Sequence, residues 1–224
     1  MVPARRWPGR LRPVARVGLV CASAAVVLGA CADSGYQYVK SPSEDAFFKV
    51  PDSWELYQIE AEEPTDRVEP IDLGGSEPWQ LVFDGSPEAS LDHVAQAAPD
   101  APVGQAVVLD LSSSQRDAVS LAALRASSTT DGKDPLELAG QGDPTMEIIA
   151  YEDLVTADDM RGSHIVFNRQ LEDGTWITVD HTALLNPATT RAYLFTVRCS
   201  ATCFESNQSE ISRIVGSWTV EKKG

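Results

Sequence analysis

The chain has 224 residues, and its 33 acidic residues outnumber its 18 basic ones, which gives a formal net charge of −15. The first 30 residues hold five of the basic residues and none of the acidic ones, so the 194 residues from 31 to 224 carry a net charge of −20. This charge argues against a nucleic-acid-binding protein, because phosphates require a basic surface. It also argues against adhesion to anionic lipid by charge alone.

The N-terminal segment has the pattern of an export signal. Five arginines precede an uncharged, mostly apolar run from Val17 to Ala30, which ends in Leu28-Gly29-Ala30-Cys31. The run suits the apolar part of a signal peptide and is short for a membrane span, which needs ~20 residues. A transmembrane anchor is the alternative.

These last residues resemble the lipobox of bacterial lipoproteins, in which the residue matching Cys31 is lipidated on sulfur and the chain is cut just before it. The resemblance implies a signal peptide of residues 1–30 and a protein attached to the extracytoplasmic face of the cell membrane. A diacylglyceryl group, with chains such as palmitate, would supply the two acyl chains that stable anchoring requires.

Residues 31–42 predict a tether, because after Cys31 they are small, polar and weakly patterned. Fully extended, such a segment reaches roughly 35–40 Å. We therefore expect it to lift a single domain of residues 43–224, a length that supports a full core, clear of the lipid headgroups.

Alternation of apolar and polar residues between turn-forming residues predicts most of the elements. In chain order, the predicted strands are Ala46–Val50, Trp54–Ile59, Trp79–Phe83, Gln105–Leu109, Glu147–Tyr151, Gly162–Leu171, Trp176–Leu185, Arg191–Arg198 and Ser217–Val220. Helices are predicted from Ser86 to Ala98, from a capping box at Ser114–Asp117 through Leu124, and from Phe204 to Val215, with loops at 60–72 and 127–142. This order predicts an α+β fold in which two or three helices cover an antiparallel sheet.

Two short motifs resemble a known family. The segment FFKVPDSWELY (Phe47–Tyr57) resembles the opening hairpin of PsbP-like domains, and ISRIVGSWTVEK (Ile211–Lys222) resembles their last helix and strand. Exported actinobacterial lipoproteins of the LpqN type are similar as well, and the arginine- and alanine-rich N-terminal segment fits that setting. The resemblance covers roughly Tyr38 to Lys222. It implies an α/β/α sandwich and a non-enzymatic binding or assembly role, and transfers no functional residue, since fold alone does not fix function.

Two cysteines remain besides those of the N-terminal segment. Cys199 and Cys203 are predicted to form a disulfide, the simplest state of an exported pair so close in sequence. The bridge would pin the end of a strand to the next helix and would stabilise the protein by roughly 2 kcal/mol. A metal site would need more ligands, and the three histidines are far apart in sequence.

No motif in the sequence predicts catalysis. The Gly-x-Ser-x-Gly elbow of serine hydrolases is missing. Asp180 and His181 are residue types of a catalytic triad, but neighbours on a strand point to opposite faces. We expect His181 and His164 to be strand residues with satisfied hydrogen bonds, and His93 to lie exposed on a helix.

Aromatic and acidic residues have ordinary explanations at this stage. Core packing is expected for most of the tryptophans in or beside strands, which are Trp54, Trp79, Trp176 and Trp218. The acidic stretches 60–63, Asp131–Asp134 and Asp158–Asp159 lack the spacing of a calcium-binding EF-hand and predict solvated loops.

Together these observations predict a lipid-anchored binding or assembly factor for a protein or another envelope ligand, with no cofactor, no metal and no catalytic residue. Two alternatives stay open. One is an envelope-acting hydrolase whose site is assembled only in three dimensions, which a deep polar cleft would favour. The other is a carrier of lipid or another small molecule, which would need an enclosed apolar cavity.

Overall fold

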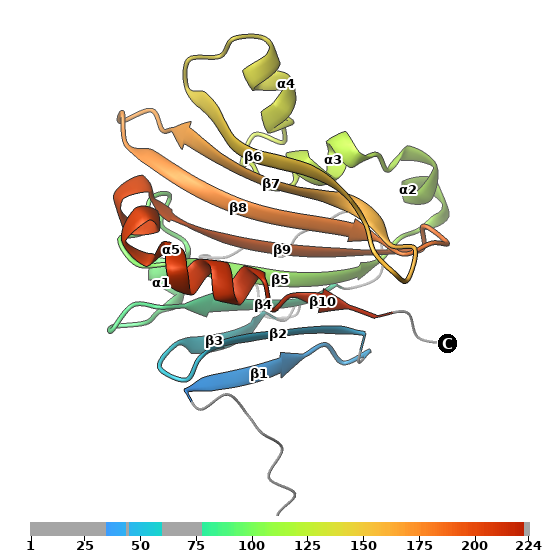
Figure 1. Cartoon of the computed structure of the whole chain (residues 1–224), viewed down its shortest axis with the longest axis horizontal. Coiled ribbons are helices and arrows are strands. Elements are labelled where there is room, and N and C mark those ends of the chain that lie inside the picture. Colours follow the sequence, from blue (N-terminus) through green and yellow to red (C-terminus); the bar gives the residue numbers. More distant parts are fainter. Residues whose placement is uncertain (1–34, 44, 60–77, 222–224) are drawn as a thin grey trace, which may run out of the picture. The chain divides into compact units, whose positions relative to one another are not determined.

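The computed structural model describes residues 35–43, 45–59 and 78–221 (Figure 1). The N-terminal segment with Cys31 and the predicted loop at 60–72 lie outside these residues. The strands are β1 Tyr36–Lys40, β2 Ala46–Pro51, β3 Glu55–Ile59, β4 Trp79–Asp84, β5 Val103–Asp110, β6 Met146–Val155, β7 Arg161–Gln170, β8 Trp176–Leu185, β9 Arg191–Ser200 and β10 Thr219–Val220. The helices are α1 Leu91–Val94, α2 Ser113–Ala118, α3 Leu121–Ala126, α4 Pro135–Gly140 and α5 Ala201–Val215.

Seven of the strands form one antiparallel sheet in the order β3-β4-β5-β9-β8-β7-β6. Strands β6 to β9 follow one another through tight turns, and the sequence predicts the two turns that join β7, β8 and β9. After β5 the chain leaves the sheet, forms α2, α3 and α4, and returns at the far edge as β6. The α+β class is therefore confirmed, with an edge strand that begins a meander.

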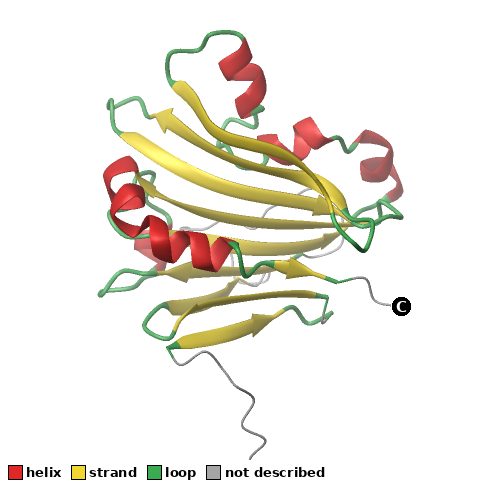
Figure 2. Ribbon diagram, in the orientation of Figure 1, coloured by secondary structure: helices red, strands yellow, loops and turns green. Residues whose placement is uncertain are grey.

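Different elements cover the two faces of this sheet (Figure 2). Val103 of β5 packs under α1, and Val107 of the same strand packs near Leu124 of α3, so both helices lie on one face. Helix α4 joins them there, against a cluster that includes Ile165 and Val179. The opposite face is covered by α5 and by the small sheet β1-β2-β10.

An aromatic cluster fills the space between the small sheet, α5 and the large sheet. Phe195 of β9 stacks on Trp218 with 4.9 Å between ring centroids and meets Phe48 of β2 edge-on at 5.1 Å. Phe83 and Trp54 continue the cluster. Each buried ring of this kind contributes about 1.5–3 kcal/mol, so this is the principal core of the domain.

Helix α5 begins at Ala201, three residues before the predicted Phe204. Ser200 caps it by accepting a hydrogen bond from the Cys203 amide, and the Cys199–Cys203 bridge joins the end of β9 to the first turn. Ile211 and Ile214 are fully buried at helical spacing.

The small sheet corrects the predicted tether. Tyr36–Lys40 form β1, paired with β2 in a register that places Val39 opposite Phe48, and Val39 is buried in the aromatic core. The folded part therefore begins at least as early as Tyr36, and only four residues of sequence separate Cys31 from β1.

Two predicted helices have different boundaries in the structure, and a third helix lies in a predicted loop. Helix α1 is capped by Ser90, because the Asp84 carboxylate accepts hydrogen bonds from the amides of Ser86 and Ser90 and holds that segment as a turn. The capping box is formed by Ser112 and Gln115.

The third error is α4, which lies inside the segment predicted as a loop. Asp134 caps this helix and Pro135 occupies its first turn, an arrangement that favours helix initiation. Its apolar residues Leu136 and Leu138 pack on the cluster of Ile165 and Val179, on the face of the sheet that also carries α1 and α3.

Candidate functional site

A polar row crosses the outer strands β6, β7 and β8 on the face that carries α5. Helix α5 packs on β9 and β8, and β6 and β7 extend beyond it (Figure 1). The row consists of Glu152, His164 and Asp180, one residue from each strand, and we call it the carboxylate–histidine row. Antiparallel register places Glu152 directly opposite His164, and Asp180 lies diagonally beside it.

His164 lies between two carboxylates. Its Nε2 is 2.8 Å from Asp180 Oδ1, and its Nδ1 is 3.8 Å from Glu152 Oε1. The hydrogen bond to Asp180, opposed by partial burial and assisted by the charges of Asp180 and Glu152, raises the pKa of His164 above its usual 6.5. When it is protonated, the imidazole donates a hydrogen bond to Asp180.

A second polar ladder lies on the same face, towards the opposite ends of these strands. The Thr178 hydroxyl donates to Asn168 Oδ1 over 2.7 Å, and the Asn168 amide donates to Glu147 Oε2 over 3.0 Å. With the carboxylate–histidine row, this ladder makes the open part of the sheet acidic and rich in hydrogen-bonding groups.

Strand β6 forms the edge of the large sheet beside this polar surface. It pairs with β7 on one side, and no described strand pairs with its other side. Three apolar side chains project from it into solvent: Ile149 is 55 % exposed, Tyr151 39 % and Val155 75 %. Ile149 occupies an irregularity in the β6–β7 register. A long edge strand with exposed apolar side chains is a surface on which another chain can pair.

Tyr151 is tied to the helices behind the sheet. Its hydroxyl accepts a hydrogen bond from Arg125 over 3.3 Å and donates one to Asp153. Arg125 in turn makes a bidentate ion pair with Asp134, the cap of α4, with contacts of 2.9 and 2.6 Å. Asp134 is thus part of a buried ion pair, whereas the sequence predicted a solvated loop.

The two remaining histidines are structural. His181 is buried, and its Nε2–H donates to the Leu124 carbonyl while its Nδ1 accepts from the Thr196 hydroxyl. Burial lowers the pKa of His181 to about 4. The prediction of a satisfied strand histidine is confirmed.

His93 is not exposed as predicted. It is a residue of α1 whose side chain is buried, with Nδ1 2.8 Å from Asp84 and Nε2 3.1 Å from Asp100. Asp100 lies before β5, and its side chain is otherwise exposed.

The structure bears on the predicted disulfide but not on the predicted lipidation of Cys31. The Cys199–Cys203 disulfide is present, whereas Cys31 lies outside the described residues. In the described ranges no group of three or more His, Cys, Asp or Glu side chains is placed to hold a metal ion.

Four surface depressions in the described residues are lined by other residues than those of the carboxylate–histidine row. Their volumes are about 220 to 500 Å³. The largest of these four lies between α3 and α4 and is lined mainly by small or helix-surface residues such as Ala122, Ala126 and Glu137. Within the row, the Glu152 side chain is exposed, His164 is partly buried and Asp180 is buried.

We compared the sequence with protein families and curated proteins, and the fold with solved structures. No family model and no curated protein matches the chain. The structure is similar to those of PsbP-like proteins.

The solution structure of cyanobacterial PsbP (CyanoP) from Synechocystis sp. PCC 6803 has a TM-score of 0.49 and 15 % identity, and the match covers 86 % of this chain and 98 % of that one. LpqN, described as involved in cell envelope biogenesis of Mycobacterium tuberculosis, has a TM-score of 0.47 and 13 % identity over 85 % of this chain and 94 % of its own. The Saccharomyces cerevisiae Ran-binding protein Mog1p has a TM-score of 0.42 and 11 % identity over 83 % and 95 %.

The similarity to PsbP-like and LpqN structures agrees with the resemblance seen in the sequence, and it concerns the fold alone. Among the described residues, no helix is long and apolar enough to cross a membrane.

Proposed function

We propose that this protein is a lipoprotein anchored through Cys31 at the extracytoplasmic face of the membrane, where it binds an extended segment of another protein. The observation that supports this function best is β6, a ten-residue edge strand bordered by an acidic polar surface. The anchor is supported by the sequence from the N-terminal arginines to Cys31.

The side chains of β6 indicate which kind of peptide would bind there. A peptide that adds as a further strand gains main-chain hydrogen bonds along the edge, and its alternate side chains meet those of the strand. Ile149 and Val155 offer apolar contacts to such a peptide. Strand β6 contains three acidic residues and no basic one, so electrostatic complementarity favours a partner segment with basic residues.

Photo-crosslinking in the producing cell tests this function. A photoreactive amino acid replaces Ile149 in the full chain, and the matched control replaces Glu172, which is exposed in the β7–β8 turn. We expect a defined protein adduct at position 149 and not at 172. The crosslinked segment is then identified by mass spectrometry and titrated as a synthetic peptide against the protein.

The variant Ile149→Lys/Val155→Lys provides the second measurement. Because both side chains are largely exposed, we expect the fold to be retained and the peptide affinity to fall at least tenfold, the effect of losing about 1.4 kcal/mol. Equal adducts at positions 149 and 172, or unchanged affinity in the double variant, would refute peptide binding at β6. The anchor is tested separately, because Cys31→Ser is expected to release the protein or leave it unprocessed.

A hydrolase is the second candidate, because His164 is oriented by Asp180 as a catalytic base would be. We favour binding over hydrolysis because the second imidazole nitrogen of His164, Nδ1, faces Glu152. A general base needs a nitrogen within hydrogen-bond reach of the proton it removes, and among the described contacts His164 meets carboxylates only.

A further inference from the structure

A small depression lies on the face of the large sheet that carries α1, and its volume is about 220 Å³. Its apolar part is formed by Val82, Val94 and Val103, and its polar part by Gln105 of β5 with Thr196 and Arg198 of β9. The β5–β9 register places Gln105 opposite Thr196 and Val103 opposite Arg198, so these four residues are neighbours on the sheet. We call this feature the Arg198 depression.

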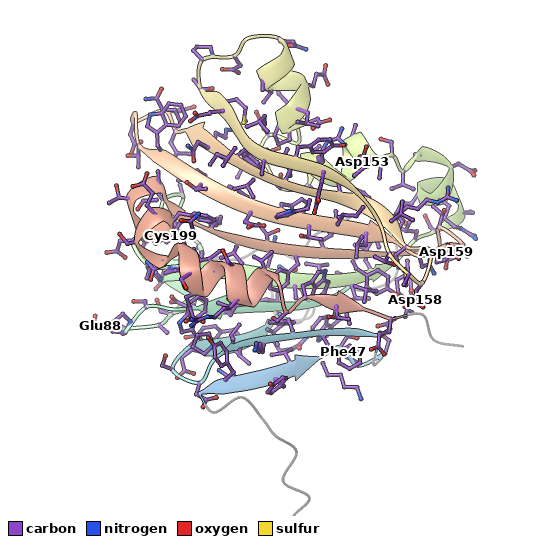
Figure 3. All side chains as sticks on the ribbon, viewed as in Figure 1. Phe47, Glu88, Asp153, Asp158, Asp159 and Cys199 are labelled. Atoms are coloured by element: carbon purple, nitrogen blue, oxygen red, sulfur yellow. A yellow bond between two sulfur atoms is a disulfide. The ribbon has the colours of Figure 1, made fainter. Side chains whose placement is uncertain are left out.

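Arg198 points to this face because side chains alternate along a strand. Cys199, the next residue of β9, is labelled beside α5 in Figure 3 and is buried in the core under that helix. The side chain of Arg198 therefore lies on the other face of the sheet, where its guanidinium reaches the chain just after α1. The Arg198 depression and the carboxylate–histidine row are thus on opposite faces, and a ligand here would not depend on peptide binding at β6.

The charge of Arg198 has no carboxylate partner among the described residues. Its guanidinium donates to three backbone carbonyls over 2.7 to 3.1 Å, those of Val94, Gln96 and Ala97. Three other arginines instead make ion pairs with aspartates, namely Arg125, Arg169 and Arg191. Asp100, which follows the carbonyls that Arg198 binds, contacts His93.

The environment of Arg198 favours an added counter-charge. Burial lowers the pKa of Arg198 to about 10, so the group is charged at neutral pH although it is partly withdrawn from water. The three carbonyls hold the guanidinium in place but carry no net charge. A bound anion would compensate a buried positive charge that the described residues leave unpaired.

Both Arg198 and Gln105 have N–H groups to offer a ligand. A guanidinium has five N–H groups, and the contacts with carbonyls engage three of them, so the Nε–H and one N–H of Nη2 remain. Gln105 accepts a hydrogen bond from Gln80 through Oε1 over 3.2 Å, and no described acceptor meets its Nε2. The Thr196 hydroxyl donates to His181. The donors of Arg198 and Gln105 suit a carboxylate, which only accepts hydrogen bonds.

We propose that the Arg198 depression is a binding site for a short aliphatic carboxylate. The carboxylate lies against the Arg198 guanidinium and the Gln105 amide, and hydrogen bonds between ionised groups of this kind are stronger than those between neutral groups. The aliphatic part of the ligand lies against the three valines of the depression, where its apolar surface is removed from water.

The size and the two-part lining of the depression define the ligand further. Pockets for drug-sized molecules have volumes of ~300–1,000 Å³, and the Arg198 depression, with about 220 Å³, is smaller. A long acyl chain would not fit within it, and an inorganic anion would leave the valines without an apolar contact. Isovalerate, which has one carboxylate and a short branched apolar end, matches both parts and serves as the probe.

The test measures the binding of radiolabelled isovalerate to the full chain in mild detergent by equilibrium dialysis, with detergent alone as the background. The decisive variant is Gln105→Glu, which keeps an acceptor for Gln80 and places a carboxylate in the polar part of the depression. Its matched control is Gln208→Glu, which adds the same charge at an exposed position of α5. Arg198→Gln is the second variant, and circular dichroism and thermal unfolding establish that it is folded, since it also removes the donors to three carbonyls.

We expect saturable binding of one isovalerate per chain. Gln105→Glu and Arg198→Gln should each weaken it at least about tenfold, whereas Gln208→Glu should leave it unchanged. Isovaleramide, which has the same shape without the charge, and acetate, which lacks the branched end, should each displace the label at least about tenfold less well.

Three results would overturn the carboxylate site: no saturable binding to the folded protein, equal displacement by isovaleramide, or unchanged affinity in Gln105→Glu. Equal displacement by acetate would overturn the aliphatic part of the proposal. Peptide binding at β6 is measured on the opposite face of the sheet, so its failure and the failure of this site are distinguishable.

Discussion

His181 is predicted to make the free energy of unfolding fall as the pH is lowered from about 6.5 to about 4. Burial lowers the pKa of this imidazole from 6.5 to about 4 in the folded protein, whereas the unfolded chain keeps the ordinary value. Between these two pH values the unfolded state therefore binds a proton that the folded state does not, and stability rises with pH. The slope is about 1.4 kcal/mol per pH unit, and the total loss is about 3 kcal/mol.

The assay compares the protein with His181→Gln in urea unfolding followed by tryptophan fluorescence. Glutamine is neutral at all these pH values and can keep both hydrogen bonds, donating to the Leu124 carbonyl and accepting from the Thr196 hydroxyl. We expect the variant to be less stable near neutral pH because its side chain fits the buried site less well. Its stability should also depend less steeply on pH, by about one proton.

The other titrating groups are common to both proteins, so their contributions cancel in the difference. His164 acts with the opposite sign: its raised pKa gives a stabilisation that is complete below pH 6.5 and is lost as the pH rises through its folded-state value. Parallel stability curves between pH 6.5 and 4 would refute the argument for His181. So would a ring that titrates near pH 6.5 in the folded protein by NMR.

Three further outcomes follow from particular contacts. Asp180→Asn should lower the pKa of His164, since a neutral amide replaces the carboxylate whose hydrogen bond is the largest cause of the upward shift and whose charge adds to it; an NMR titration that leaves the pKa unchanged would contradict this. Asp134→Ala should cost about 3–5 kcal/mol in denaturant unfolding, because its guanidinium partner is left buried without a carboxylate. Gly162→Ala should lower the free energy of unfolding by about 1–3 kcal/mol, because the added Cβ would lie 1.8 Å from the backbone oxygen of Ala183 in β8. The matched control is Gly140→Ala. It has open space around it and should leave the free energy of unfolding unchanged or raise it.

The second half of the fold is predictable from sequence because its strands are long and regularly patterned. The predicted strand Trp176–Leu185 has the same first and last residue as β8. Turn-forming residues separate it from the strands before and after it. In such a hairpin, alternation and turn chemistry agree on one register. The helix after β9 has a cap and a buried face with helical spacing, so it was found as well, with its start only three residues late.

Strand β1 and helix α4 were not predicted, because neither has a clear pattern of apolar residues. Strand β1 has a single buried apolar residue, Val39, in an otherwise polar segment, so its composition is that of a tether. It becomes a strand through pairing with β2, which is a tertiary effect. Helix α4 is only six residues long, too short for a clear apolar period.

The carboxylate–histidine row was missed because its partners lie on different strands. Sequence reasoning considered Asp180 together with its neighbour His181, but these two side chains point to opposite faces. Asp180 instead meets His164 through the β7–β8 register. That register follows from the predicted hairpin, so pairing the two strands on paper would have brought the side chains together. The burial of His93 depends on Asp84 and on the turn at Asp100, which no local pattern encodes.

The pairing of β10 with β2 has a consequence for the order of events during synthesis and export. Thr219 pairs with Phe47, so the first hairpin cannot complete its sheet until almost the whole chain has emerged. Trp218, beside that last strand, also closes the ring cluster around Phe195. Contacts between such distant segments slow folding. If the proposed signal peptide directs the chain across the membrane N-terminus first and unfolded, the aromatic core would be completed only after Trp218 and β10 have crossed.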